Sequence, residues 1–445
     1  MSYQETIDYL YGLQHHGIKL GLDNSILLME LMGNPHRTFR SVHIAGTNGK
    51  GSTAAFLESI LRHAGLRVGL YTSPHLVSFT ERIRVNNIQI SEEDVVALAG
   101  RIRKAYQQNV PSGALQPFSP TFFEVTTAMA FTYFAEHGID IAVVEVGMGG
   151  RLDSTNVLTP LISIITNIDF EHTEFLGTTL EQIAGEKSGI IKEGIPVITG
   201  VAQPEVVPVV ERTARESHAP LYCLGTDFSA ENISGESEQV FDYRGIKDFY
   251  GSLGVGMRGS YQVDNACLAV AATECLRDYD IRIDEAGISR GLKLTNWEGR
   301  LECVSERPAI FLDGAHNPRS ARMLSQAMEA MRASYRKLIL VIGILSDKDY
   351  RGMISAFAAL ADHIVVTRPG YSRAMNLDAL AAEARKFHDN VDTADTVGAA
   401  ISAARELASE DDCILITGSL YVVGDARAVL VPDAGRTEAL RGLTG

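Results

Sequence analysis

The segment Gly46-Thr47-Asn48-Gly49-Lys50-Gly51-Ser52 constrains this chain more than any other part of its sequence. It follows the short apolar run 42–45 and opens a segment, 53–63, whose apolar residues repeat with a helical period. A strand, a glycine-rich loop and a helix start form a cradle for nucleotide phosphates. The backbone N–H groups approach phosphate oxygens, a lysine reaches the β- and γ-phosphates, and a hydroxyl serves Mg²⁺. The spacing departs from a strict Walker A motif, and the structural alternative is a glycine-rich turn.

Bulk composition narrows the class of protein. The 445 residues suffice for two or three domains, and the net charge of −15 with no long basic block argues against a nucleic-acid partner. The five cysteines are scattered and lack metal-type pairing, which indicates reduced core thiols. The first residues are polar and acidic, unlike a targeting peptide, and no apolar run approaches the length of a membrane span. We therefore expect a cytoplasmic protein with no membrane contact.

Short apolar runs alternate with helical patterns along most of the chain, which predicts an α/β fold with mostly parallel sheets covered by helices. The expected strands of the first part are 42–45, 67–71, 141–146, 161–166 and 196–199, and its clearest helices are 53–63 and 121–137. Residues 220–258 are rich in Gly, Ser, Asp and aromatics and indicate a small β-rich insertion. After a helical segment, 263–277, a second alternation has strands at 309–312, 337–342, 363–367 and 413–417. A boundary near 295–300 separates two α/β domains.

Polar residues follow several of these strands, where parallel sheets bind ligands. Glu145 ends an apolar strand and is followed by glycines, which favours a ligand site over a structural salt bridge. Ser73 suits a metal on a nucleotide, although for this residue taken alone an ordinary Ser-Pro turn is the favoured explanation. His172 lies in an acidic loop where a surface role is the alternative, and Lys187 has the alternative of a helix-end charge or a partner of Glu186. The segment 313–318 is a further polar cluster after a strand.

Nine motifs occur in a fixed order along nearly the whole chain: GTNGKGS, TSPHL, VEVGMGGRLDSTN, EHTEFLG, EKSGIIK, DNA at 264–266, WEGR at 297–300, DGAHNP and GSLYVVGDAR. Together they resemble the folylpolyglutamate synthase/dihydrofolate synthase family of the Mur ligase superfamily. The resemblance implies two domains. The first, 1–296, is an ATP-binding Mur-ligase-type domain with a P-loop-type sheet, the phosphate loop and the metal site. The second, 297–445, is a C-terminal Rossmann-like ligase domain.

The resemblance also implies a reaction of folate biosynthesis and one-carbon metabolism. Such enzymes use MgATP to phosphorylate the carboxylate of a pterin substrate, and the α-amine of L-glutamate then attacks the acyl phosphate, which yields ADP, phosphate and an amide. The implied substrates are dihydropteroate or a reduced folate, L-glutamate and ATP, and the implied state is a monomer. A bifunctional dihydrofolate synthase/folylpolyglutamate synthase is expected. The alternatives are a folylpolyglutamate synthase only, or a Mur-type ligase with another amino-acid acceptor.

Site residues follow from the matching motifs by position. The resemblance assigns ATP binding to Gly49, Lys50, Gly51, Ser52, Asn265, Arg300 and Asp313, two Mg²⁺ ions to Ser73, Glu145 and His172, and the glutamate and acyl-phosphate side to His316 and Ser419. It assigns the pterin to Phe122, Phe123, Leu152 and Asp153, with the segment 18–22 near the same substrate. Lys187 matches a lysine that family members carbamylate, so Lys50, Lys187 and His316 are the expected catalytic residues. A monovalent cation is a further expected ion.

Two motifs depart from the family pattern. This chain has Asp169-Phe170-Glu171-His172 where Gly-Leu-Asp-His is common. The acidic side chain before the histidine is therefore one methylene longer, which affects the expected geometry of the second metal site. It has Trp297-Glu298-Gly299-Arg300 where Trp-Pro-Gly-Arg is common, which we expect to loosen the hinge without displacing Arg300.

Three other functions explain less of the sequence. A P-loop kinase or GTPase leaves the second α/β domain with DGAHNP unexplained, and a cell-wall Mur ligase needs a UDP-binding domain for which the residues before 46 are too few. A non-catalytic nucleotide-binding module does not need Glu145, His172 and Lys187 together.

Overall fold

An eight-stranded sheet forms the centre of the N-terminal part in the computed structural model, which describes residues 1–16, 21–109, 119–235 and 238–431. Its strands, in spatial order, are β4 (Ile88–Gln89), β3 (Ile83–Val85), β2 (Val68–Tyr71), β5 (Ile141–Glu145), β1 (Arg40–Ala45), β6 (Ile162–Ile165), β7 (Val197–Thr199) and β8 (Leu221–Cys223). All neighbours pair in parallel except β2–β3 and β3–β4, so the prediction of a mostly parallel sheet is confirmed. Most of the predicted substrate segment 18–22 lies outside the described residues.

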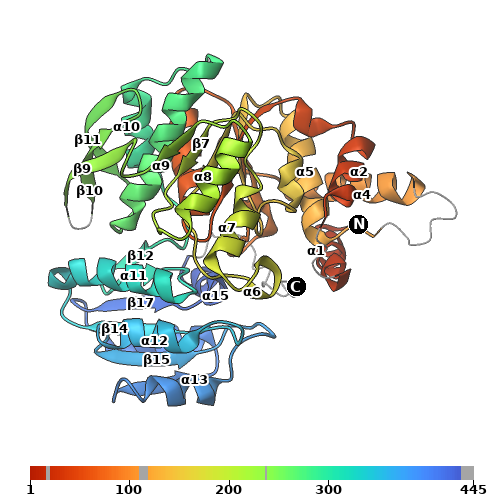
Figure 1. Ribbon diagram of the computed structural model, residues 1–445. Helices are drawn as coiled ribbons and strands as arrows, with labels where there is room; N and C mark the ends of the chain where they lie inside the picture. Colours follow the sequence, from red (N-terminus) through yellow and green to blue (C-terminus); the bar gives the residue numbers. More distant parts are fainter. Residues whose placement is uncertain (17–20, 110–118, 236–237, 432–445) are drawn as a thin grey trace.

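Helices cover both faces of this sheet (Figure 1). The helices of the N-terminal part are α1 (Tyr3–Gly12), α2 (Asp23–Leu31), α3 (Lys50–His63), α4 (Glu92–Asn109), α5 (Phe122–Glu136), α6 (Thr173–Leu176), α7 (Leu180–Ser188), α8 (Val207–Glu216), α9 (Tyr261–Leu276) and α10 (Glu285–Leu294). In Figure 1, α9 and α10 lie on one side and α1, α2, α4 and α5 on the other. None of the helices in the described ranges is long and apolar enough to cross a bilayer.

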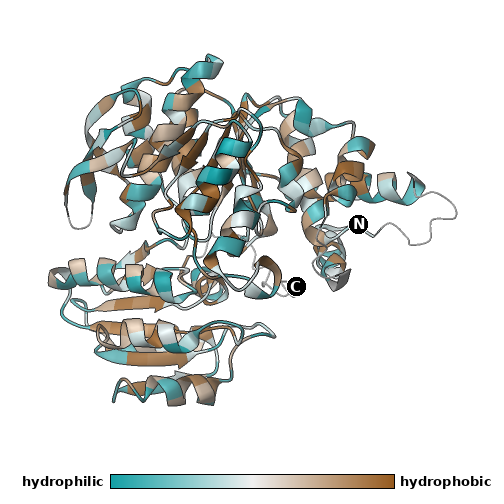
Figure 2. Ribbon diagram, viewed as in Figure 1, coloured by the Kyte–Doolittle hydropathy of each residue, from teal (hydrophilic) through white to brown (hydrophobic). Residues whose placement is uncertain are grey.

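Alternation along the central strands produces two separate cores. Val42, Ile44 and Val143 point to one face, where they pack with α3, α9 and α10. Ala142 and Val144 point to the other face, where they pack with α1, α2, α4 and α5. Because both faces are buried, the central strands are nearly continuous apolar runs, which Figure 2 shows as brown ribbons in the middle of the molecule.

The segment 220–258 is only partly the insertion that its composition predicts. Its first strand, β8, extends the large sheet by pairing in parallel with β7. The later strands β9 (Ser229–Ser234), β10 (Gln239–Arg244) and β11 (Phe249–Val255) form the separate three-stranded antiparallel sheet. Phe241 and Tyr243 of β10 join the core that includes α9, and the three strands contact α9 while β11 also contacts α10, so the insertion packs on these helices.

The C-terminal part is built on a six-stranded sheet in the order β12 (Glu302–Glu306), β13 (Ala309–Leu312), β17 (Cys413–Thr417), β14 (Leu338–Ile342), β15 (His363–Thr367) and β16 (Val391–Ala394). Only β12 runs antiparallel to its neighbour, which agrees with the Rossmann-like expectation. Its helices are α11 (Pro318–Ala330), α12 (Tyr350–Ala358), α13 (Leu377–Ala384), α14 (Val397–Leu407) and α15 (Leu420–Leu430). Figure 1 shows this part in teal to blue, with α11 beside the N-terminal part. The boundary at 296/297 stays a prediction.

Candidate active site

One pocket is lined by loops from the carboxyl ends of strands in both large sheets. The predicted site residues that line it are Gly49, Lys50, Gly51, Ser52, Ser73, Glu145, His172, Asn265, Arg300, Asp313, His316 and Ser419. Residues separated by more than two hundred positions therefore meet in one space. Five predicted residues are not part of its lining: Phe122, Phe123, Leu152, Asp153 and Lys187.

The glycines of the phosphate loop stand where no side chain fits. Gly46 has a φ of +143°, and a Cβ there would lie 1.9 Å from Oγ1 of Thr166. Gly49 has a φ of +85°, and its Cβ would lie 2.4 Å from Oδ1 of Asn265. Gly49 is also the N-cap of α3 and has no side chain to satisfy the first N–H groups of that helix. These N–H groups and the helix dipole favour a phosphate at this point.

Lys50 folds back over the loop that precedes it. Its Nζ donates to the carbonyl oxygens of Gly46 at 2.8 Å and Thr47 at 3.1 Å. The ammonium is therefore already next to the place where phosphate oxygens would contact the loop. The predicted helix start at 53 is corrected to Lys50, because Gly49 provides the left-handed turn that begins the helix earlier.

The end of β6 holds the phosphate loop, a role that the sequence analysis did not assign. The side-chain amide of Asn167 accepts the Asn48 N–H at 2.9 Å and donates to the Asn48 carbonyl at 2.8 Å. The Thr166 hydroxyl donates to the same carbonyl at 2.7 Å, and the Thr47 N–H donates to the Asn167 carbonyl at 2.9 Å. Local sequence contains no signal for these contacts beyond the polar residues after a strand.

Glu145 is the last residue of β5 and is only 5% exposed. Its Oε2 accepts the backbone N–H of Ser73 at 3.2 Å. Burial raises the pKa of the Glu145 carboxyl, and the positive charge of Lys50 opposes this rise. A buried carboxylate that faces a lysine and a helix start is suited to a cation or to a phosphate-bound metal.

Glu145 and Ser73 together form a donor set that fits Mg²⁺. This ion prefers oxygen ligands and is commonly bound by one or two carboxylates, with waters and substrate phosphates completing its shell. No cluster of three or more His, Cys, Asp or Glu side chains placed for a metal occurs within the described ranges. His172 lines the same pocket from an exposed position just before α6, with a φ of +45°. The expectation of two ions stays a prediction.

Lys187 lies beneath the phosphate loop and is 1% exposed. Its Nζ donates to the Gly46 carbonyl at 2.9 Å and forms an ion pair with Glu171. Burial lowers the pKa of Lys187 to about 8, although the Glu171 carboxylate opposes this shift. The partner considered from the sequence is wrong, because Glu186 instead pairs with Arg151 at 2.8 Å.

The C-terminal sheet contributes Asp313 and His316 to the pocket. Asp313 is 5% exposed, and its two carboxylate oxygens accept the N–H groups of Ala315 and Leu301, each at 2.9 Å. Burial raises the pKa of Asp313, and the charge of Arg300 opposes the rise. Burial lowers the pKa of His316 to about 4, so its imidazole is neutral near pH 7. Nδ1 of His316 lies 2.9 Å from the Gly314 carbonyl, which assigns the proton to Nδ1 and leaves Nε2 with its lone pair.

Asn265 and Ser419 line the pocket but also have structural partners. The Asn265 side chain on α9 donates to Oε1 of Gln262 at 2.9 Å, while its Oδ1 faces Gly49. Ser419 is the N-cap of α15, accepts the Val422 N–H, and donates to the Gly343 carbonyl at 3.1 Å. Asn265 therefore lies directly against the loop at Gly49, whereas the Ser419 hydroxyl is held by its own helix.

Some of the four residues predicted to bind the pterin lie close to one another. Phe122 and Phe123 begin α5, and Phe123 stacks on Tyr71 with a centroid distance of 5.9 Å. A Cβ on Gly147 would lie 2.5 Å from Phe123, which places this ring beside the loop after β5. Asp153 belongs to the same loop, but it is 6% exposed and accepts the N–H groups of Met148 and Thr155.

The two parts of the chain also contact each other directly at the pocket. The side-chain amide of Asn317, the N-cap of α11, donates to Oδ1 of Asn48 in the phosphate loop at 2.9 Å. Arg319 on the first turn of α11 donates to the Ile168 carbonyl at 3.4 Å. Sequence reasoning missed these contacts because they join residues 269 and 151 positions apart.

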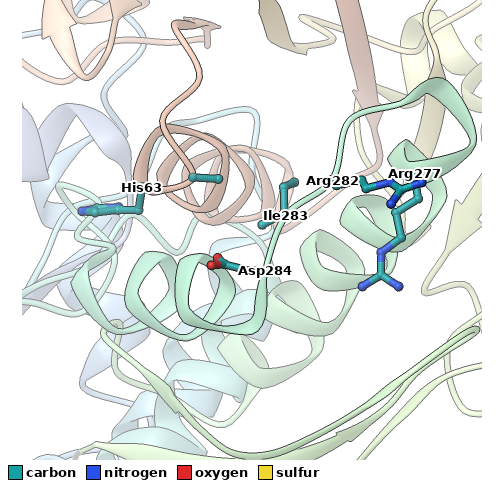
Figure 3. A pocket seen from close by; sticks show the side chains of 6 residues that line it. His63, Arg277, Arg282, Ile283 and Asp284 are labelled. Atoms are coloured by element: carbon teal, nitrogen blue, oxygen red, sulfur yellow. The ribbon is translucent and has the colours of Figure 1, made fainter.

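A second hollow lies away from this site, between the end of α3 and the start of α10 (Figure 3). Figure 3 shows His63 on one side and Arg277 on the other, with Asp284 between them. Asp284 accepts the Gly287 N–H at 2.8 Å as the N-cap of α10, and Arg277 forms an ion pair with Asp248. These charged groups are engaged in structural contacts, so the pocket between the two sheets is the stronger candidate site.

Comparisons with known proteins identify the domain families of both parts of the chain. Residues 44–273 match the Mur ligase middle domain, and residues 299–420 match the Mur ligase glutamate ligase domain. A dihydrofolate synthase/folylpolyglutamate synthase of Bacillus subtilis is 38% identical over 96% of this chain and 98% of that protein.

Solved structures are similar over almost the full length. A Mycobacterium tuberculosis folylpolyglutamate synthase complexed with ADP is 32% identical, with a TM-score of 0.89 over 97% of this chain and 100% of the other. An Escherichia coli FolC structure in complex with DHPP and ADP is 30% identical, with a TM-score of 0.86 over 98% of this chain and 99% of the other.

Proposed function

The chain belongs to the dihydrofolate synthase/folylpolyglutamate synthase family of Mur ligases, and we propose that it performs both reactions of that family. It is an ATP-dependent ligase. In the proposed reactions, it joins L-glutamate to dihydropteroate and adds further glutamate to a reduced folate. One observation carries the proposal: a single pocket contains the phosphate loop and Glu145 from one sheet and Arg300, Asp313 and His316 from the other. The alternative is a folylpolyglutamate synthase only.

The phosphate loop and Lys50 bind the phosphates of ATP in this proposal. Phosphoryl transfer depends on positioning and charge neutralisation more than on covalent help from the protein. The N–H groups at the start of α3 and the Lys50 ammonium contact the β- and γ-phosphates, and Glu145 and Ser73 are the residues that would hold Mg²⁺. The bound ion would supply further positive charge to the transferring phosphoryl group. The substrate carboxylate attacks the γ-phosphorus, and ADP leaves with the electrons of the broken P–O bond.

The second half of the reaction takes place beside His316. The neutral α-amine of glutamate attacks the acyl carbon and the tetrahedral intermediate collapses. The C–O bond to phosphate breaks, and inorganic phosphate leaves with the bonding electrons and takes up the proton that the amine loses. The lone pair on Nε2 of His316 accepts a hydrogen bond from the amine and orients it, which its lowered pKa of about 4 permits near pH 7. Exclusion of water protects the acyl phosphate from hydrolysis, so we propose that the parts 1–296 and 297–445 close over the substrates.

Two further proposals concern the state of the enzyme. The lowered pKa of Lys187 favours the neutral amine that captures CO₂, so we propose that Lys187 becomes a carbamate when Glu171 is drawn away from it. The cysteines Cys223, Cys267, Cys275, Cys303 and Cys413 are all free, which supports a reducing, cytoplasmic location. One copy of the chain supplies every residue named for the site, which supports a monomer.

A direct assay separates the candidate functions. The purified protein is incubated with ATP and Mg²⁺, with dihydropteroate or tetrahydrofolate, and with or without L-glutamate, while ADP release and product mass are followed. Glutamate-dependent mass gain on both substrates supports the bifunctional ligase. Gain on tetrahydrofolate alone supports the alternative. ADP release without any gain in substrate mass would refute the ligase proposal.

A further inference from the structure

Arg84 is a buried cation that the proposed reaction does not use. It lies on β3 and is 5% exposed. Its Nε donates to the Glu81 carbonyl at 3.2 Å, and Nη1 donates to Oδ1 of Asn87 at 3.1 Å. Glu81 lies in the short 3-10 turn before β3 and Asn87 in the turn after it, so both contacts hold the guanidinium on the β3 side.

The remaining contacts of Arg84 reach the segment that joins the two sheets. Its Cζ lies 4.9 Å from the centre of the Trp297 ring. Nη2 and Nη1 lie 3.2 Å and 3.5 Å from the two carboxylate oxygens of Glu298. This is a two-pronged ion pair combined with a cation–π contact, and only the flat fork of arginine makes both at once. The side chains are 6% and 22% exposed, so solvent screens this pair less than a surface pair.

The joining segment leads directly into the candidate site. Arg300, which lines the pocket, donates its N–H to the Trp297 carbonyl at 3.3 Å, and Gly299 between them has a φ of +67°. On the other side of Trp297, its Nε1 would lie 3.1 Å from a Cβ on Gly51. Trp297, which Arg84 contacts, is therefore connected to Arg300 by a tight turn and also lies close to the start of α3.

We propose that Arg84 is a positioning residue for nucleotide binding, which acts by holding Trp297 and Glu298 so that Arg300 faces the phosphate loop. From the sequence we expect the hinge to be looser because Glu298 stands where proline is common. In the structure, the ion pair with Arg84 connects Glu298 to the N-terminal sheet. The proposal rests on the proposed function in one respect only: it assumes that a single nucleotide is bound by both Lys50 and Arg300. Without Arg84 the turn samples other arrangements, and fewer molecules present Arg300 to the ligand.

A double-mutant cycle with ADP as the ligand tests the proposal. The variants are Arg84→Met, Arg84→Lys, Glu298→Gln, Arg300→Met and the combination of Arg84→Met with Arg300→Met. The dissociation constant for ADP is measured by calorimetric titration, and the melting temperature is recorded for each variant. The matched control is Arg101→Met, which removes a helix arginine whose ion pair with Glu136 is exposed and away from the joining segment.

Arg84→Met is expected to weaken ADP binding roughly tenfold, the scale of one lost coupling between neighbouring groups. In the Arg300→Met background the same change is expected to weaken binding less than twofold, because Arg84 acts through Arg300. Arg84→Lys is expected to fall in between, Glu298→Gln to weaken binding a few-fold, and Arg101→Met to bind as the unchanged protein does.

Two results would overturn the proposal. One is unchanged ADP binding by Arg84→Met. The other is an equal weakening with and without Arg300, which would mean a merely structural role. If Arg84→Met does not fold, Arg84→Lys and Glu298→Gln in the same cycle with Arg300→Met decide in the same way. Because no ligase substrate is needed, failure of the ligation assay leaves this test intact.

Discussion

Replacing Asn167 by alanine tests whether the phosphate loop depends on the strand end beside it. The variant loses both amide hydrogen bonds to the backbone of Asn48, at 2.9 Å and 2.8 Å. The Asn48 carbonyl keeps the Thr166 hydroxyl as a donor, so only the Asn48 N–H loses its partner. At about 1 kcal/mol for each neutral hydrogen bond, the ordered conformation of the phosphate loop loses about 2 kcal/mol of stabilisation. If nucleotide binding must restore that order, ADP affinity falls by roughly 30-fold.

The assay is calorimetric titration of ADP into the purified variant, with glutamate-dependent ADP release measured in parallel. The matched control is Asn376→Ala, which removes the N-cap of α13, a hydrogen bond to the Ala379 N–H of 3.0 Å. That change costs about 1 kcal/mol of stability without touching the phosphate loop. ADP affinity near that of the unchanged protein for Asn167→Ala, or an equal loss for Asn376→Ala, would refute the reasoning.

Four further outcomes are expected. Lys50→Ala should lower turnover by roughly 100-fold or more with little change in melting temperature, and near-normal turnover would contradict the phosphate-loop assignment. Glu145→Gln should weaken the Mg²⁺ dependence of activity far more than Ser73→Ala, whereas retained activity with a lower melting temperature would make Glu145 structural. Lys187→Arg should be inactive, since arginine forms no carbamate, and wild-type turnover would rule the carbamate out. His43 is a fully buried residue of β1, and burial lowers the pKa of its imidazole to about 3 from the ordinary 6.5. Below pH 6.5 the unfolded chain therefore binds a proton that the native chain does not, so the stability of the protein should fall as the pH drops below 6.5. Between pH 7 and pH 5, urea unfolding should show a smaller loss of unfolding free energy for His43→Gln than for the unchanged protein. An equal loss in the two proteins would contradict this.

Sequence by itself was sufficient for the features that depend on local pattern. The apolar run before Gly46, the glycines and the lysine predict a strand, a phosphate loop and a helix, and the structure has β1 and α3 there. The strands predicted at 309–312, 363–367 and 413–417 match β13, β15 and β17 within a residue, because buried parallel strands are short apolar runs bounded by polar turns. Motif order was enough to recognise the family.

Tertiary structure decided everything that depends on distant partners. The sequence alone offered Lys187 a neighbour, Glu186, but the chain pairs it with Glu171, sixteen residues away, because the loop after β6 returns over α7. The strand at 221–223 reads locally like the insertion around it, yet the free edge of β7 recruits it into the large sheet. The contacts of Asn167 with Asn48 and of Arg84 with Glu298 span 119 and 214 positions. Local sequence specifies the elements through propensity and periodicity, whereas these pairings depend on which buried polar groups find partners after the elements pack.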